Sequence, residues 1–123
     1  MNIEEFGAYC SSKKAVTEEF PFDNDTLVCK VGGKIFALVS LKKWEEGTPS
    51  VNLKCNPERA VILREQYEDI VPGYHMSKVH WNTIYINKGV NDALLKQLVD
   101  DSYALVLKSL TKKIQQEISE LLT

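Results

Sequence analysis

Apolar residues keep a helical spacing near the N-terminus and change to an alternating spacing soon afterwards. Asn2 followed by Glu5 resembles a capping box, and the positions that follow predict a helix over residues 3–14. Strand-forming residues dominate the next part of the chain. They predict three strands, over residues 16–22, 27–31 and 34–41.

Gly32 and Gly33 separate the second of these strands from the third. A connection of two glycines is typical of a β-hairpin, because glycine accepts the positive φ angles that such a turn requires. The pair therefore predicts an antiparallel hairpin. The segment 44–49 contains a glycine and a proline and is predicted to be a loop.

Alternation returns over residues 51–55, where Asn52 and Lys54 are expected to face outward and the apolar residues inward. One face of the sheet is therefore expected to contact water. Asn56 then provides an N-cap and Pro57 the first helical position, which predicts a second helix. Its apolar stripe is formed by Ala60, Leu63 and Tyr67.

Two strands are expected between the second helix and the last. A Pro-Gly bend at Pro72 precedes one of them, which is predicted over residues 82–87. From Asn91 or Asp92, apolar residues keep helical spacing almost to the C-terminus. The polar triplet at 100–102 either divides this stretch into two helices or lies within one. The elements predict an α+β fold, and the 123 residues fit a single domain, 1–123.

Composition is that of an ordinary globular domain, with 44% hydrophobic and 26% charged residues. No apolar stretch approaches the roughly 20 residues of a membrane helix, and the acidic N-terminus does not resemble a signal peptide. A cytoplasmic protein without a membrane contact is therefore expected. The net charge of −2 conceals a basic middle, because residues 28–88 carry nine Lys and Arg against six acids. An anionic partner is expected to bind there.

The sequence offers little support for catalysis. The three cysteines, Cys10, Cys29 and Cys55, are odd in number and lack CxxC spacing, which indicates reduced and buried thiols. His75 and His80 flank a bend without the spacing of a metal site and without an orienting carboxylate or a nucleophile. Phosphate-binding and dinucleotide-binding glycine motifs are absent from the sequence. We expect no catalytic residue, no metal and no cofactor.

Basic and aromatic residues gather instead on predicted turns and strand ends. They are Lys30, Lys34, Lys42, Lys43, Trp44, Lys54, His75, Lys78, His80 and Trp81. Lysine-rich hairpins and loops with neighbouring aromatics can contact phosphates and stack on bases. The alternative is that the lysines protect sheet edges from aggregation, and that Trp81 braces the sheet against a helix.

Several separate segments resemble the MmcQ/YjbR family of small bacterial proteins, in the same order and at the same spacing. The resemblance lies in Lys30-Val31-Gly32-Gly33-Lys34, Phe36-Ala37, Val51 to Glu58, Leu63-Arg64-Glu65, Ile70 to Met76, Lys78, His80-Trp81-Asn82-Thr83, Asp101-Ser102-Tyr103 and Leu105-Val106. It implies a two-layer fold like that of type III secretion chaperones, with an antiparallel sheet and the order α-β(3-4)-α-β(2)-α. It also implies DNA binding in a double-wing mode, in which two β-loops grip the duplex.

Two functional hypotheses follow. The first is a non-enzymatic protein that binds double-stranded DNA weakly and in a salt-sensitive way, with the lysines on phosphates and Trp44 or Trp81 stacking. The second is a protein-interaction or chaperone-like domain that uses the wet face of the sheet or the long C-terminal helix and has no nucleic-acid role. A monomer is expected in either case.

Overall fold

The computed structural model describes residues 1–73, 76–86 and 88–121. Within these residues, six antiparallel strands form one sheet in the order β1-β2-β3-β4-β6-β5. The strands are β1 (Val16–Glu19), β2 (Thr26–Val31), β3 (Lys34–Ser40), β4 (Ser50–Lys54), β5 (Ile70–Pro72) and β6 (Trp81–Tyr85). The helices are α1 (Ile3–Ser11), α2 (Leu41–Glu45), α3 (Pro57–Gln66), α4 (Asp92–Ser109) and α5 (Lys112–Ser119).

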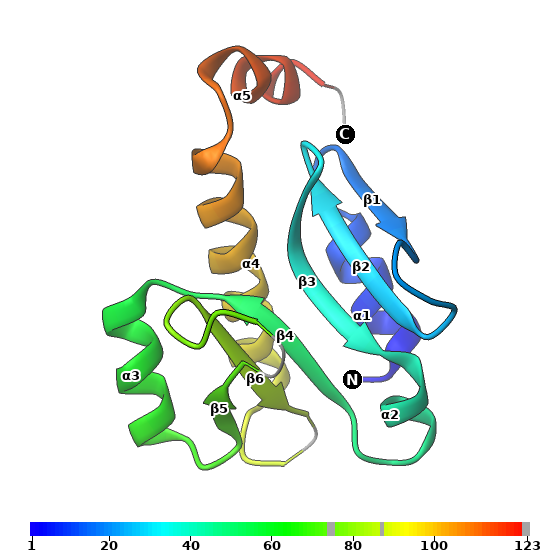
Figure 1. The fold of residues 1–123 in the computed structure, drawn as a ribbon, viewed down its shortest axis with the longest axis vertical. Helices are drawn as coiled ribbons and strands as arrows, with labels where there is room; N and C mark the ends of the chain where they lie inside the picture. Colours follow the sequence, from blue (N-terminus) through cyan, green and yellow to red (C-terminus); the bar gives the residue numbers. More distant parts are fainter. Residues whose placement is uncertain (74–75, 87, 122–123) are drawn as a thin grey trace.

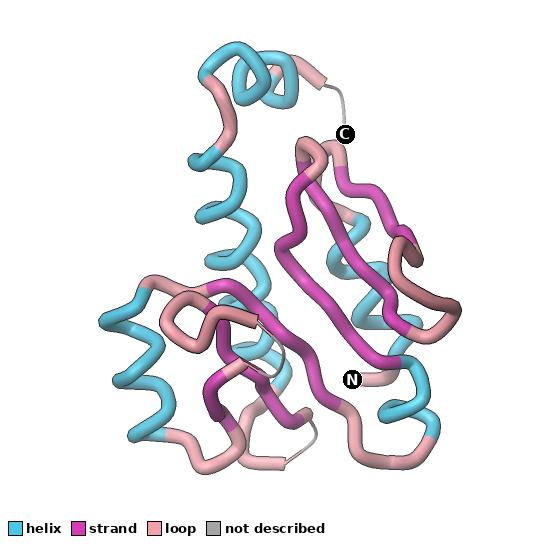
Figure 2. Tube along the Cα trace, in the orientation of Figure 1, coloured by secondary structure: helices cyan, strands magenta, loops and turns pink. Residues whose placement is uncertain are grey.

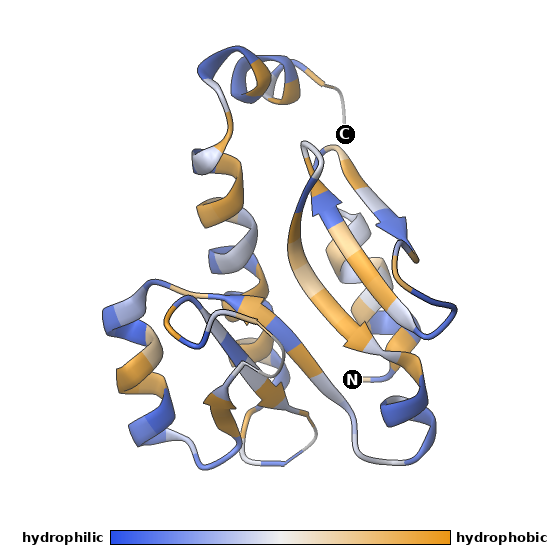
Figure 3. Ribbon diagram, viewed as in Figure 1, coloured by the Kyte–Doolittle hydropathy of each residue, from blue (hydrophilic) through white to orange (hydrophobic). Residues whose placement is uncertain are grey.

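The helices and the sheet form two layers. Figure 1 shows α1 and α4 behind the sheet, while α3 lies beside β5 and β6. The core lies between these layers and contains Phe6, Phe36 and Leu95, each exposed by 1% or less. Hydrophobic residues dominate β2 and β3, whereas α2 is largely hydrophilic (Figure 3). The predicted α+β class with an antiparallel sheet is confirmed.

The hairpin predicted from the glycine pair is present between β2 and β3. Gly32 and Gly33 have φ angles of 57° and 80°, and Val31 pairs with Lys34. The tip of the hairpin packs against Leu110, since a methyl group added at Gly32 would lie 2.5 Å from its Cδ1 atom. The hairpin is therefore held against the connection between α4 and α5 (Figure 2).

Helix boundaries differ from the sequence prediction in two places near the N-terminal half. The first helix ends at Ser11 rather than at residue 14, because the chain turns before Ala15, which has a φ of 61°. Residue 44, predicted to begin a loop, lies in the short helix α2. This helix depends on Asp25, whose carboxylate accepts from the backbone N–H of Lys42 at 2.7 Å and from the Ser40 hydroxyl at 2.7 Å.

The C-terminal helical stretch divides at Leu110, and the division considered at residues 100–102 is not present. Helix α4 continues through residues 100–102 and ends at Ser109, and Thr111 caps α5 by accepting from the N–H of Ile114 at 3.2 Å. The polar residues of the triplet do not end the helix, because they contact other elements. Asp100, for example, accepts hydrogen bonds from Tyr9 and Lys13 of the α1 region.

Ser102 joins the two halves of the sheet. Strands β3 and β4 share only two paired positions, Ala37 with Leu53 and Leu38 with Asn52, and the sheet opens beyond them. The Ser102 hydroxyl donates to the carbonyl of Phe36 at 2.6 Å and accepts from the N–H of Lys54 at 2.9 Å. A side chain of α4, fully buried, thus replaces the strand pairing that is lost between β3 and β4.

None of the helices in the described residues is of a length and hydrophobicity that would cross a membrane.

Candidate functional site on the open face of the sheet

The face of the sheet opposite α1 and α4 is hollowed into a groove of about 870 Å³. Its apolar lining consists of Phe22, Ile35, Leu38 and Met76. Its polar lining consists of Thr26, Ser40, Thr48, Ser50, Asn52 and Thr83, together with Tyr85 and Lys43. Among the described lining residues there is one cation and no carboxylate. The groove is of the size that small ligands occupy in other proteins.

Strand alternation explains why these residues share one face. Leu38 pairs with Val28 and Asn52, and Asn52 pairs with Thr83, so side chains at these positions point to the same side. The outward orientation predicted for Asn52 and Lys54 is confirmed, because both are half-buried while Val51 and Leu53 are buried. The Thr83 hydroxyl donates to the Asn52 Oδ1 atom at 2.5 Å, which fixes the amide on the groove floor.

Lys43 stands at one end of the groove on a rigid support. The Ser40 hydroxyl accepts from the Lys43 N–H at 3.4 Å, and the Lys43 carbonyl accepts from the N–H of Thr48 at 2.9 Å. The backbone of Lys43 is therefore held on both sides while its side chain is exposed. No described carboxylate lies within 4.0 Å of its ammonium group.

Arg64 of α3 holds the turn that precedes β6. Its guanidinium donates to the Asn82 Oδ1 atom at 2.7 Å, to the Trp81 carbonyl at 3.3 Å and to the carbonyl of Lys78. The turn at residues 77–80 is thus tied to α3, and the His80 carbonyl accepts from the N–H of Cys55 at 2.7 Å. Sequence reasoning did not assign this role to Arg64, because its partners are brought to it only by the pairing of β4 with β6.

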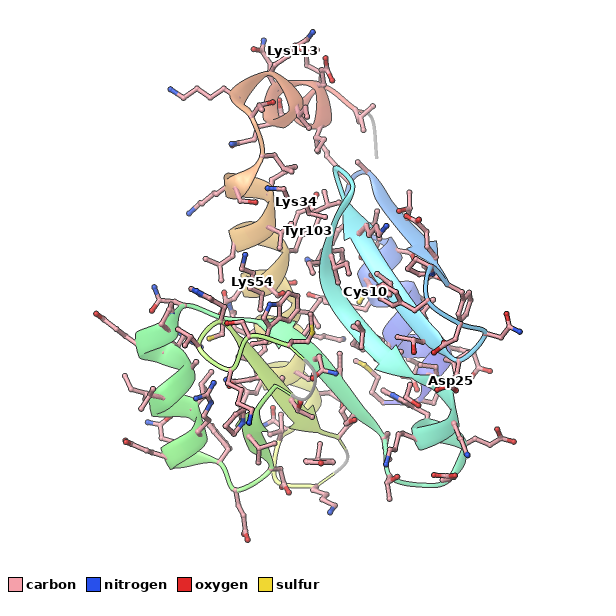
Figure 4. The ribbon with its side chains drawn as sticks, viewed as in Figure 1. Cys10, Asp25, Lys34, Lys54, Tyr103 and Lys113 are labelled. Carbon is pink, nitrogen blue, oxygen red and sulfur yellow. The ribbon has the colours of Figure 1, made fainter. Side chains whose placement is uncertain are left out.

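The predicted lysines do not form one cluster. Lys34 begins β3 and Lys43 follows its end, so about 20 Å of strand separates them. Figure 4 shows Lys34 on the part of the molecule toward α5, Lys54 about midway along the molecule, and Asp25 near α2. Lys34 pairs with the core residue Val31, which places it on the helix side of the sheet, so the cations of the open face are separated from it as well.

Two of the lysines have acidic partners. The Lys30 ammonium lies 3.4 Å from Glu19, and that of Lys42 lies 4.0 Å from Glu46. Among the described residues, no carboxylate lies within 4.0 Å of the ammonium groups of the remaining candidates, which are Lys34, Lys43, Lys54 and Lys78. Only these cations are available to an external anion without competition from an ion pair.

The two tryptophans are packed against the protein. Trp81 is 9% exposed, and Trp44 contacts Phe6 at a ring distance of 5.8 Å and donates its indole N–H to the Ser50 carbonyl at 3.0 Å. This packing favours the bracing role over stacking on a base. His80 is exposed, and His75 lies outside the described residues.

The described residues offer little that resembles a catalytic centre. They contain no group of three His, Cys, Asp or Glu side chains that could hold a metal ion. Hydrogen bonding with Cys29 and burial raise the pKa of the Cys10 thiol, and burial raises that of Cys55. Thiols with raised pKa values are poor nucleophiles at neutral pH.

Comparisons with known proteins agree on one family. A family model described as YjbR matches residues 11–105. The chain is 39% identical over 99 residues to "Uncharacterized protein YbdF" of Escherichia coli O157:H7, covering 80% of this chain and 79% of that protein. It is 33% identical over 121 residues to "Uncharacterized protein YjbR" of Escherichia coli K12, covering 98% of this chain and 100% of the relative.

A solved structure extends the similarity to the fold. The crystal structure of Deinococcus radiodurans protein DR2400, described as a DUF419 domain, aligns with a TM-score of 0.88 and 34% identity. The alignment covers 96% of this chain and 88% of that chain.

Proposed function

The chain belongs to the YjbR family, and from this premise we propose that it is a non-enzymatic protein that binds double-stranded DNA weakly through the open face of its sheet. The contact set consists of Lys43, Lys54 and Lys78, which have no carboxylate within 4.0 Å among the described residues. Lys30 and Lys42 are left out of it, because Glu19 and Glu46 engage them.

The observation that supports this proposal is the charge pattern of the open face. Lys43 lines a groove whose described lining contains no carboxylate, and Lys54 faces outward on β4 beside it, although the whole chain has a net charge of −2. Phosphate contacts gain free energy by releasing counterions, so three contacts give weak binding that depends strongly on salt. The negative net charge opposes this attraction, which is why an affinity in the micromolar range at low salt is expected.

The double-wing arrangement finds only partial support. The turn at residues 77–80 carries Lys78, and Arg64 donates to the carbonyl of that lysine, which supports a contact by this turn. The Gly32 hairpin, by contrast, packs against Leu110. We therefore place the second contact at α2, where Lys43 extends from the opposite end of the face.

Fluorescence anisotropy of a labelled duplex tests the proposal. We expect a micromolar Kd at low salt, and the triple variant K43Q/K54Q/K78Q should weaken binding at least tenfold and lower the salt slope by about three. The matched control is K108Q/K112Q/K113Q, which changes the net charge equally on exposed helix positions at the end of α4 and in α5. Equal weakening by both variants, or no anisotropy change at any salt, would refute the proposal.

Two exposed phenylalanines favour a second candidate, a protein-interaction domain. Phe20 and Phe22 are 48% and 65% exposed on the connection between β1 and β2, and Phe22 also lines the groove. Exposed aromatic side chains beside a concave surface are typical of protein-binding sites. A nuclease-treated pull-down should return one stoichiometric partner that F20S/F22S loses and V61S, an exposed substitution on α3, retains. Equal loss by both variants would contradict this candidate.

We further propose that the protein acts as a monomer in the cytoplasm. All three cysteines are free and buried, as expected for a protein in a reducing compartment. Sedimentation analysis across a concentration series would test the monomer, since a concentration-dependent increase in mass would contradict it.

A further inference from the structure

The lining of the open groove combines an apolar surface with polar groups. Ile35 and Leu38 of β3 are half-buried on the floor, and Phe22 and Met76 lie in the segments on either side of it. Phe22 is 65% exposed, which is costly for a large aromatic ring unless another surface covers it. This part of the groove is suited to a hydrocarbon or aryl group.

Two polar groups of the lining offer hydrogen-bond donors that no described acceptor engages. Lys43 lines the groove without a described carboxylate within 4.0 Å. The Asn52 Oδ1 atom accepts from Thr83, so the amide nitrogen is left as a donor toward the groove, and no described residue accepts from it. Lys43 and Asn52 both line the groove, and an ammonium and an amide N–H can each donate to a carboxylate oxygen.

An acid of this region, Asp25, is already engaged. Asp25 accepts from the Ser40 hydroxyl with one oxygen and from the Lys42 N–H with the other, each at 2.7 Å. Its carboxylate therefore stabilises the start of α2 and is absent from the described lining of the groove. Among the described lining residues, Lys43 is the one that carries a charge.

We infer that the groove binds a small amphiphilic acid, with one carboxylate at Lys43 and Asn52 and an apolar body of several carbons along Ile35 and Leu38. The groove volume of about 870 Å³ is sufficient for such a ligand. A ligand of this class gains free energy by covering the exposed Phe22 ring, and its single negative charge complements the single cation. This site goes beyond DNA binding, because it depends on the apolar floor rather than on the lysines at the far end of the face.

Calorimetric titration with octanoate and with octan-1-ol tests the inference. The two probes share an alkyl chain and differ in the carboxylate, so octanoate should bind at least tenfold more tightly. K43M should weaken octanoate binding about tenfold and leave octan-1-ol binding unchanged, because a hydrogen bond to a charged partner is lost. The matched control is K42M, which removes the adjacent exposed lysine outside the groove and should change neither affinity.

Location and folding are checked with two further measurements. In ¹H–¹⁵N spectra, octanoate should shift the amide signals of Leu38, Asn52 and Thr83, and the circular dichroism of K43M and K42M should match that of the wild type. L38N, which makes the floor polar, should weaken both probes. The inference is overturned if octanoate does not bind, if both probes bind equally, if the two lysine variants behave alike, or if the shifted signals lie elsewhere.

Discussion

Replacing Ser102 by alanine removes the hydroxyl that joins β3 to β4. The side chain is fully buried, and its two hydrogen bonds to the Phe36 carbonyl and the Lys54 N–H measure 2.6 and 2.9 Å. Each buried group left without a partner costs about 1–3 kcal/mol, and alanine regains about 0.5 kcal/mol of helix propensity. For the two groups together, we expect S102A to lower the free energy of unfolding by about 1.5–5.5 kcal/mol.

Urea unfolding followed by circular dichroism measures this loss. With a urea m-value of about 2 kcal/mol/M, the midpoint should fall by about 0.8–2.8 M while the m-value stays the same. The matched control is S119A in α5, where an exposed serine donates to the Gln116 carbonyl at 2.7 Å, and its effect should stay within about 0.5 kcal/mol. Hydrogen exchange supplies a local test, since the amide of Lys54 should exchange faster in S102A. An S102A midpoint within 0.3 M of the wild type would refute the reasoning.

Two further predictions concern backbone packing and pH. G73A should lower the free energy of unfolding by about 1–3 kcal/mol, because a methyl group there would lie 2.8 Å from the Trp81 Cβ atom; an unchanged thermal midpoint would contradict this. Asp100 should stabilise the fold above about pH 4. Burial raises the pKa of its carboxyl group, but the hydrogen bonds from Lys13 and Tyr9 have the larger effect and leave the pKa below its usual value. The stability difference between wild type and D100N should therefore shrink as pH falls from about 4 through that lowered pKa, and urea midpoints that differ equally at pH 7 and pH 2 would refute it.

The sequence predicted those parts of the fold that depend on local signals. The Gly32 hairpin, the capping box at Asn2 and the cap at Asn56 are all present, because each is determined by a few neighbouring residues. Helix α2 was missed because its start depends on Asp25, which lies some fifteen residues earlier in the chain. The division at Leu110 was missed for a similar reason, since contacts with other elements keep α4 helical through Asp100.

For the candidate site, the sequence predicted only which side chains of β4 face outward. Alternation in β4 placed Asn52 and Lys54 on the wet face correctly. The groove itself requires the pairing of β3, β4 and β6, which brings together residues that are distant in sequence, such as Leu38 and Thr83. The ion pair of Lys30 with Glu19 likewise depends on the pairing of β1 with β2, so the number of available lysines was not evident from their spacing.

The weak junction between β3 and β4 has a geometric consequence for the groove. Its lining comes from both three-stranded halves, with Ile35 and Leu38 on one side of the junction and Ser50 and Asn52 on the other. A small rotation of one half against the other would change the width of the groove without breaking any strand pair inside either half. The Ser102 hydroxyl, on the opposite layer, therefore limits how far the two walls of the groove can separate.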